Sequence, residues 1–225
     1  MLREIVLDTE TTGFEPSDGH RLVEIGCVEL VNHIPTGRVF HTYINPEREV
    51  PGDAFSVHGL SYEFLKNHPP FKEVGALFLE FIEETPLVIH NAKFDMKFIN
   101  AELKVFGWPE IPFNRAIDTL ALARQKFPGS PASLDALCKR FGVDNTEREK
   151  HGALLDAELL AQVYLELIGG KQPGLTLDFS SISASPSGET KQKSYREPRP
   201  HEATSEEIKL HEELIAQLNT PLWSS

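Results

Sequence analysis

The sequence has few cysteines and no long apolar run. Its two cysteines, Cys27 and Cys138, each lie within an apolar stretch, where a buried reduced thiol is the ordinary interpretation. This usage indicates a reducing compartment. The first residues lack the charged and apolar regions of a signal peptide, and no stretch of about 18 apolar residues occurs. We therefore expect a cytoplasmic protein that does not contact a membrane.

Basic residues are also scarce. The chain has 22 Lys and Arg against 34 Asp and Glu, which gives a net charge of −12. This balance argues against a protein that grips long duplex DNA by neutralising phosphates, because such binding needs a basic face. It does not exclude nucleic acid, because carboxylates can gather metal ions that meet the phosphate instead.

The length and the hydrophobic content predict one folded domain with an appendage. The chain has 225 residues, of which 40% are hydrophobic and 25% are charged, values close to those of globular proteins. Alternating or apolar runs predict strands at residues 2–7, 22–30, 39–44 and 87–89. Helical spacing predicts helices at residues 70–84, 94–106, 119–126, 133–141 and 153–168. Early strands followed by helix and strand units predict an α/β fold, a mixed sheet flanked by helices.

The composition changes after Gly170. Residues 180–205 are rich in Ser, Pro, Glu and Lys and contain almost no core-forming residues, which predicts a flexible linker. We therefore divide the chain into a folded domain at 1–170, a linker at 171–203 and a terminal segment at 204–225.

The terminal segment has the pattern of an amphipathic helix. Thr204 and Glu207 have the spacing of a capping box. The helical face that follows carries Ile208, His211, Leu214, Ile215 and Leu218. An isolated helix of this length is marginal, so we expect it to dock, either on its own domain or on a partner protein.

Two acidic residues end the first strand. Asp8 and Glu10 are two positions apart, so their side chains point to the same face of the strand. Two buried carboxylates repel each other and raise each other's pKa, and a metal ion is a natural counter-charge. The alternative is a solvated strand end without function.

Two further segments carry acidic residues at helix starts. Asp95 closes the segment HNAKFD, where an isolated Asp would more often be a capping residue. Asp156 closes HGALLD and begins a helix. His151 precedes Asp156 by five positions, about 140° away on a helix, so it belongs to the loop that enters the helix. A loop histidine there can act as a general base near neutral pH.

Three segments together resemble the DEDD-type 3′→5′ exonuclease family. DTETTG at residues 8–13 resembles its first motif, HNAKFD at 90–95 its second, and HGALLD at 151–156 its third. The His-x4-Asp spacing resembles the histidine subclass, DEDDh. The resemblance implies a ribonuclease-H-like fold and two divalent cations, Mg²⁺ or Mn²⁺. It assigns Asp8, Glu10, Asp95 and Asp156 as the metal ligands and His151 as the catalytic base.

Within that family, the chain most resembles the proofreading (epsilon) subunits of bacterial DNA polymerase III. VHGL at residues 57–60 resembles the segment that approaches the 3′ nucleotide in those subunits. The resemblance implies substrate-binding roles for Thr11, Asp53, Val57, His58 and Phe94. Asp53 stands where the family usually has Glu.

The tail resembles the same subunits. GLTLDF at residues 174–179 is similar to their clamp-binding peptide, with Gly174 in place of Gln, and residues 204–225 resemble the segment that docks on the polymerase catalytic (alpha) subunit. The resemblance implies a tether between exonuclease and polymerase, a contact with the sliding clamp and with a small accessory subunit.

These expectations combine into one mechanism and two alternatives. Cations about 3.5 to 4 Å apart would activate water and stabilise the leaving 3′ oxygen, removing mismatched nucleotides from a single-stranded or frayed DNA 3′ end. Motif chemistry at the phosphate does not distinguish DNA from RNA, so an RNA-trimming exonuclease remains an alternative. A non-catalytic scaffold that bridges replication proteins is the other.

Overall fold

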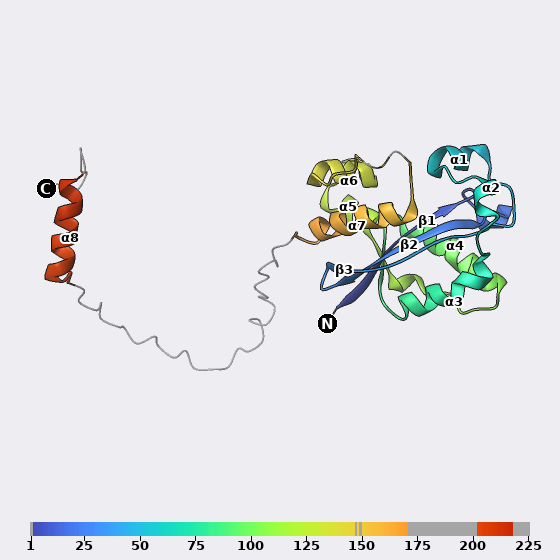
Figure 1. Ribbon diagram of the computed structural model, residues 1–225, viewed down its shortest axis with the longest axis horizontal. Coiled ribbons are helices and arrows are strands. Elements are labelled where there is room, and N and C mark those ends of the chain that lie inside the picture. The colour runs from blue at the N-terminus through green and yellow to red at the C-terminus, as the bar shows by residue number, and fades with distance from the viewer. Residues whose placement is uncertain (1, 147, 149, 171–201, 218–225) are drawn as a thin grey trace, which may run out of the picture. The chain divides into compact units, whose positions relative to one another are not determined.

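The computed structural model describes residues 2–146, 148, 150–170 and 202–217 (Figure 1). It forms two units, Met1–Leu175 and Thr176–Ser225. The predicted peptide at 174–179 lies outside the described residues, as does most of the predicted linker at 171–203.

The first unit is built around a mixed five-stranded sheet with the order β3-β2-β1-β4-β5. The strands are β1 (Arg3–Thr11), β2 (Leu22–Val31), β3 (Ile34–Tyr43), β4 (Leu87–Ile89) and β5 (Ala116–Asp118). β1, β2 and β3 pair antiparallel, whereas β4 and β5 run parallel to β1. The predicted mixed sheet is confirmed.

Helices flank the sheet. In the first unit the α-helices are α1 (Gly52–His58), α2 (Tyr62–Leu65), α3 (Phe71–Ile82), α4 (Ala92–Val105), α5 (Thr119–Lys126), α6 (Leu134–Phe141) and α7 (Ala153–Leu167), whereas α8 (Ser205–Ala216) belongs to the second unit. Short 3-10 helices occur at η1 (Pro16–Asp18) and η2 (Phe113–Arg115). The sequence predicted α3 to α8, but it predicted neither α1, α2 nor β5. In the part of the chain that the structure describes, no helix has the length and apolar character to cross a membrane.

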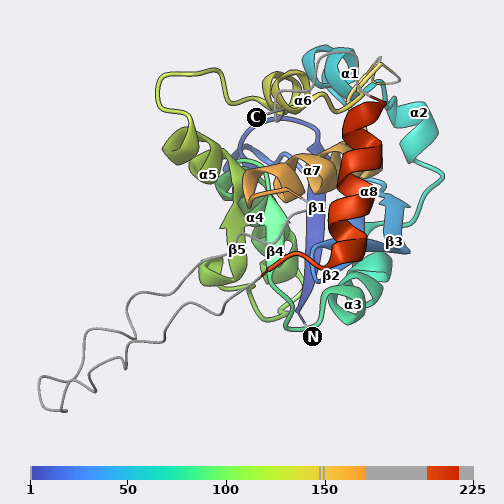
Figure 2. The ribbon, with the colours of Figure 1, turned by 90° about the vertical axis from the view of Figure 1, so that its left-hand side faces the viewer.

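Strand alternation creates two hydrophobic cores, one on each face of the sheet. Ile5 and Leu7 of β1 point into a core shared with α3 and α4. Val6 points the other way, into a core shared with α5, α6 and α7. Figures 1 and 2 show these two sets of helices on opposite faces of the sheet. Because side chains alternate along a strand, Asp8 and Glu10 follow Val6 and face the α7 side.

Two strands are longer than the sequence predicted. β1 continues beyond Leu7 to Thr11, and β3 begins at Ile34 rather than at Val39. Both extensions pair with β2, whose hydrogen bonds hold the backbone extended whatever the side-chain pattern. Asp8 and Glu10 therefore belong to the strand itself, which fixes their direction.

In the second unit, α8 begins with the predicted capping box. Thr204 accepts a hydrogen bond from the backbone N–H of Glu207, whose side chain accepts one from the backbone N–H of Thr204. Ile208 and Leu214 are exposed on this helix. The helix thus carries apolar side chains that its own residues leave exposed.

Candidate active site

The carboxylates of β1 face the start of α7 because a glycine lets that helix come close. Gly26 of β2 lies opposite Asp8 in the antiparallel register. A Cβ atom at Gly26 would lie 2.3 Å from backbone atoms of Ala153 and Leu154, the first residues of α7. Only glycine permits this approach. It brings Asp156, in the first turn of α7, to the carboxylates of β1.

Asp95 reaches the same end of the sheet from the first turn of α4. The turn before α4 contains Asn91 in the left-handed region, with φ of 62°, a conformation that Asn tolerates. The backbone N–H of Asn91 donates to Asp118, which also caps α5. Thr9 Oγ1 donates to Asp95 Oδ1 at 2.7 Å, so strand β1 fixes the orientation of this buried carboxylate.

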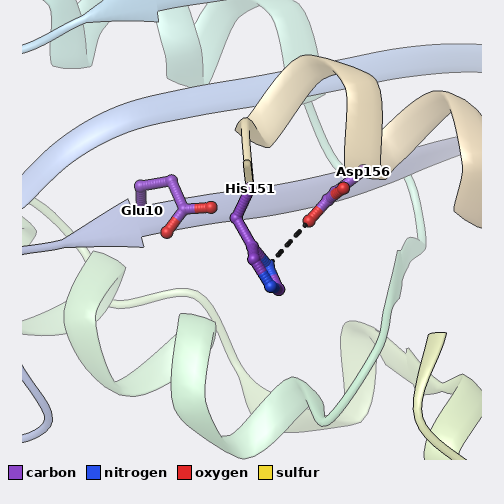
Figure 3. A group of neighbouring side chains, drawn as sticks. All are labelled: Glu10, His151 and Asp156. Atoms are coloured by element: carbon purple, nitrogen blue, oxygen red, sulfur yellow. Dashed lines mark ion pairs between the residues drawn. The ribbon is translucent and has the colours of Figure 1, made fainter. Parts of the chain in front are cut away.

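His151 lies in the loop before α7, as predicted. Its backbone N–H donates to the carbonyl of Val57 at 3.2 Å, which ties the loop to α1. Among the described residues, Glu10, His151 and Asp156 form a group whose possible ligand atoms all lie within 4.8 Å of one another (Figure 3). His151 Nδ1 lies 3.2 Å from Asp156 Oδ2. The structure therefore brings Glu10 to His151 and Asp156, from which the sequence separates it by more than a hundred positions.

Burial and mutual repulsion dominate the electrostatics of this cluster. Burial, followed by the carboxylates of Asp95, Glu10 and Asp156, raises the pKa of Asp8 well above its usual range. Burial raises the pKa of Glu10 to about 8, with further contributions from Asp156 and Glu24. Burial also raises the pKa of Asp95 to about 7. A divalent cation would relieve this repulsion, and a set of carboxylate oxygens suits a hard cation of that kind.

Two residues at the cluster were not identified from the sequence. Glu24 lies directly opposite Glu10 on β2, and its Oε1 lies 2.7 Å from His41 Nε2. Arg148 donates through Nε and Nη2 to both oxygens of Asp156, each at 2.6 Å. Arg148 belongs to a charged run that is typical of a solvated loop, so only the tertiary structure reveals it as the cation beside Asp156.

A pocket of about 660 Å³ opens beside the carboxylates. All five residues to which the sequence assigned substrate contact line it together with Glu10: Thr11, Asp53, Val57, His58 and Phe94. Residues of the β1–β2 connection, Thr12, Gly13, Phe14 and His20, complete the wall with Pro51, Ala54 and Ser56. The pocket therefore joins the end of β1, helix α1 and the start of α4.

His58 lines this pocket, and its ring nitrogen Nε2 is buried. Its Nδ1 accepts a bond from the backbone N–H of Leu60 at 3.0 Å, so the neutral ring carries its proton on Nε2. That buried Nε2 has no hydrogen-bond partner among the described residues. Burial lowers the pKa of His58, which keeps the ring neutral. His58 is the last residue of α1, and Gly59 caps that helix.

We expect the metal-free protein to lose stability as the pH rises from about 5 to about 8, because burial raises the pKa of Glu10. The folded state holds a proton on Glu10 that the unfolded chain releases above its ordinary pKa of 4.5. This stabilisation is complete at low pH and is lost as the pH rises through about 8. Thermal melting in EDTA across this range measures it.

Glu10→Gln is the control for this pH dependence. The amide does not titrate, so the variant should gain stability relative to the original chain as the pH rises. A difference in melting temperature that stays constant with pH would contradict the assigned environment of Glu10.

Comparison with known proteins gives close relatives over most of the chain. An exonuclease family matches residues 5–164. The DNA polymerase III subunit epsilon of Rickettsia felis is 50% identical over 222 residues, which cover 96% of this chain and 97% of that protein. The DNA polymerase III subunit epsilon of Escherichia coli is 46% identical over 198 residues, which cover 84% of this chain and 78% of that protein.

Solved structures share the fold. Exonuclease X in complex with 5′ overhanging duplex DNA superposes with a TM-score of 0.58 at 24% identity, covering 73% of this chain and 90% of that one. The nuclease domain of 3′hExo, a DEDDh family member bound to rAMP, superposes with a TM-score of 0.64 at 20% identity. That match covers 74% of this chain and 91% of the nuclease domain. The fold is therefore that of DEDDh exonucleases, as the sequence predicted.

Proposed function

The chain belongs to the exonuclease family and, within it, to the epsilon subunits of DNA polymerase III, from which we infer that it is a proofreading 3′→5′ exonuclease. It removes mismatched nucleotides from DNA 3′ ends for a bacterial replicative polymerase. Members of the DEDDh family depend on divalent metal ions. The chain thus associates with DNA polymerase III and with DNA.

The observation that carries the function is the convergence of Glu10, His151 and Asp156 within 4.8 Å. Asp8 and Asp95 lie near this group: after burial, the charges of Asp95, Glu10 and Asp156 raise the pKa of Asp8, and Asp95 is the strongest of them. A scaffold would gain nothing from such a cluster, since buried like charges destabilise a fold. The arrangement suits hydrolysis of a phosphodiester.

The carboxylates divide between two cation sites in this proposal. Asp8, Glu10 and Asp156 would hold the first cation, and Asp95 and Asp8 would hold the second. Oxygen ligands favour Mg²⁺ or Mn²⁺. The bound cations supply charge stabilisation and activate water.

His151 is the general base of the proposed reaction. It lies in the loop before α7, and its side chain is exposed, so it can take a proton from a water molecule at the cluster. The hydrogen bond from its backbone to Val57 holds the loop against the wall of the nucleotide pocket. Loop and pocket thus meet at the reacting phosphate.

The pocket of about 660 Å³ receives the terminal nucleotide. His58 Nε2 donates a hydrogen bond to it, since this buried donor has no other partner among the described residues. Phe94 and the exposed side chain of Val57 offer apolar contact to the base or the sugar. Thr11 and Asp53, which also line the pocket, are the remaining substrate-binding residues of this proposal.

The tail serves the polymerase in this proposal. Residues 1–170 form the exonuclease domain, and residues 204–225 dock on the catalytic (alpha) subunit through α8. The exposed Ile208 and Leu214 provide its apolar contact. Residues 171–203 act as the tether, with the sliding clamp as a further partner through 174–179 and a small accessory subunit on the domain.

A single set of assays tests activity, substrate and tail. The full chain should remove a mismatched 3′ nucleotide from a DNA primer in Mg²⁺ at least about tenfold faster than it degrades a matched RNA end. A chain ending at residue 170 should keep this activity and no longer capture the polymerase catalytic subunit in a pull-down.

The outcomes separate the alternatives. Equal degradation of the RNA end would favour the RNA-trimming exonuclease. Absence of digestion would favour the scaffold. Equal capture by both chains would refute docking through residues 204–225 while leaving the exonuclease assignment intact.

A further inference from the structure

Arg148 binds the carboxylate of Asp156, which the proposed function assigns to a cation. Its side chain, only 7% exposed, forms a two-pronged contact with Asp156. Nε donates to Oδ1 and Nη2 donates to Oδ2, each at 2.6 Å. Such a fork engages the whole carboxylate, which makes it one of the stronger ion pairs that side chains form. Asp156 therefore has its counter-charge within the chain.

The same guanidinium contacts His151. Arg148 Nη2 lies 2.8 Å from His151 Nδ1. A guanidinium group only donates hydrogen bonds, so Nδ1 must be the acceptor, and the neutral ring carries its proton on Nε2. In this state the lone pair of the imidazole is engaged, and His151 cannot take a proton from water. One cation thus masks both a proposed ligand and the proposed base.

A third contact gives Arg148 a second anchor away from the cluster. Its Nη1 donates to Asp135 Oδ1 at 2.5 Å. Asp135 lies in the first turn of α6, and its side chain is mostly exposed. The arginine can therefore leave Asp156 without losing every anionic partner. A divalent cation at Asp156 would repel the guanidinium and compete for the same two oxygens.

We propose that Arg148 is a positioning residue that holds Asp156 and His151 in an inactive arrangement and moves onto Asp135 alone when Asp156 takes up a divalent cation. This inference rests on the ligand role of Asp156 in the proposed function. Arg148 then sets the cation affinity of the first site and couples it to the release of the base.

Binding of Mn²⁺ to the metal-free full chain tests this role without an activity assay. Arg148→Gln should lower the dissociation constant for Mn²⁺ about tenfold or more, because the hydrogen bonds from the guanidinium to the charged Asp156 are lost and no longer compete with the metal ion. In EDTA, the same variant should melt at a lower temperature, since Asp156 loses its partner. Arg148→Lys keeps the charge without the fork and should bind Mn²⁺ with intermediate affinity.

Matched controls separate this role from a general charge effect. Arg140→Gln removes an exposed arginine of α6 whose guanidinium stacks on Phe127, and it should leave Mn²⁺ affinity unchanged. Asp156→Asn tests the premise. If it binds Mn²⁺ like the original chain, the ligand role of Asp156 fails.

Two results would overturn the proposal itself. If Asp156→Asn loses Mn²⁺ binding while Arg148→Gln binds no more tightly than the original chain, the ligand role stands and the role of Arg148 is refuted. Should Arg148→Gln not fold, Arg148→Lys decides by the same criterion. An equally large increase in Mn²⁺ affinity in Arg140→Gln would also refute the role of Arg148.

Discussion

Asp8→Asn should lower exonuclease activity at least about a thousandfold while stabilising the metal-free protein. Asn keeps the size and removes the charge of the residue that both proposed cations share. Burial and the neighbouring carboxylates of Asp95 and Glu10 raise the pKa of Asp8, so its ionised form is unfavourable in the folded state. If Asp8→Asn lost activity because it folds poorly, its stability would be lower than that of the original chain.

Two measurements check this prediction. Digestion of a mismatched primer in Mg²⁺ gives the activity, and thermal melting in EDTA should show a rise of roughly 2 to 4 °C. Asp18→Asn, in the exposed η1 segment, is the control and should change neither. Activity within tenfold of the original chain would refute the ligand role of Asp8.

His151→Gln should reduce the turnover number by about a hundredfold to ten-thousandfold, the range that a positioned general base supplies. Gln can still donate and accept hydrogen bonds, but it cannot take a proton from water. Substrate binding and Mn²⁺ binding should change little, because the carboxylates remain. Turnover measured at saturating primer, together with the Mn²⁺ dissociation constant, separates the base from a ligand.

The control for this variant is His211→Gln, on the exposed face of α8. It should keep full turnover. If His151→Gln instead lost Mn²⁺ binding at unchanged turnover, His151 would be a ligand rather than the base.

Local patterns in the sequence were sufficient for much of the fold. The periodicity of two placed Asp8 and Glu10 on one face of β1, and helical spacing predicted α5 at residues 119–126. These features depend on hydrogen bonds and side-chain alternation within a few residues. They can therefore be inferred without knowledge of distant contacts.

Elements stabilised by distant pairing were missed. β5 has only three residues, Ala116–Asp118, and it is a strand because it pairs parallel with β4. α1 has seven residues, with His58 buried at its end and Val57 bonded through its carbonyl to the His151 loop. Sequence segments this short show no clear hydrophobic period, so contacts with the rest of the fold decide whether they form a helix or a strand.

The sequence by itself determined the family of this protein and its candidate residues, because ordered carboxylates and a histidine at family spacing indicate which groups would bind cations and accept a proton in the proposed reaction. Only the tertiary structure decided how those groups meet. The close approach at Gly26 brings Asp156 to β1, and the fold places Arg148, which lies in a charged loop, beside the buried carboxylate of Asp156. Both depend on contacts between segments far apart in the chain, where packing and charge act through space.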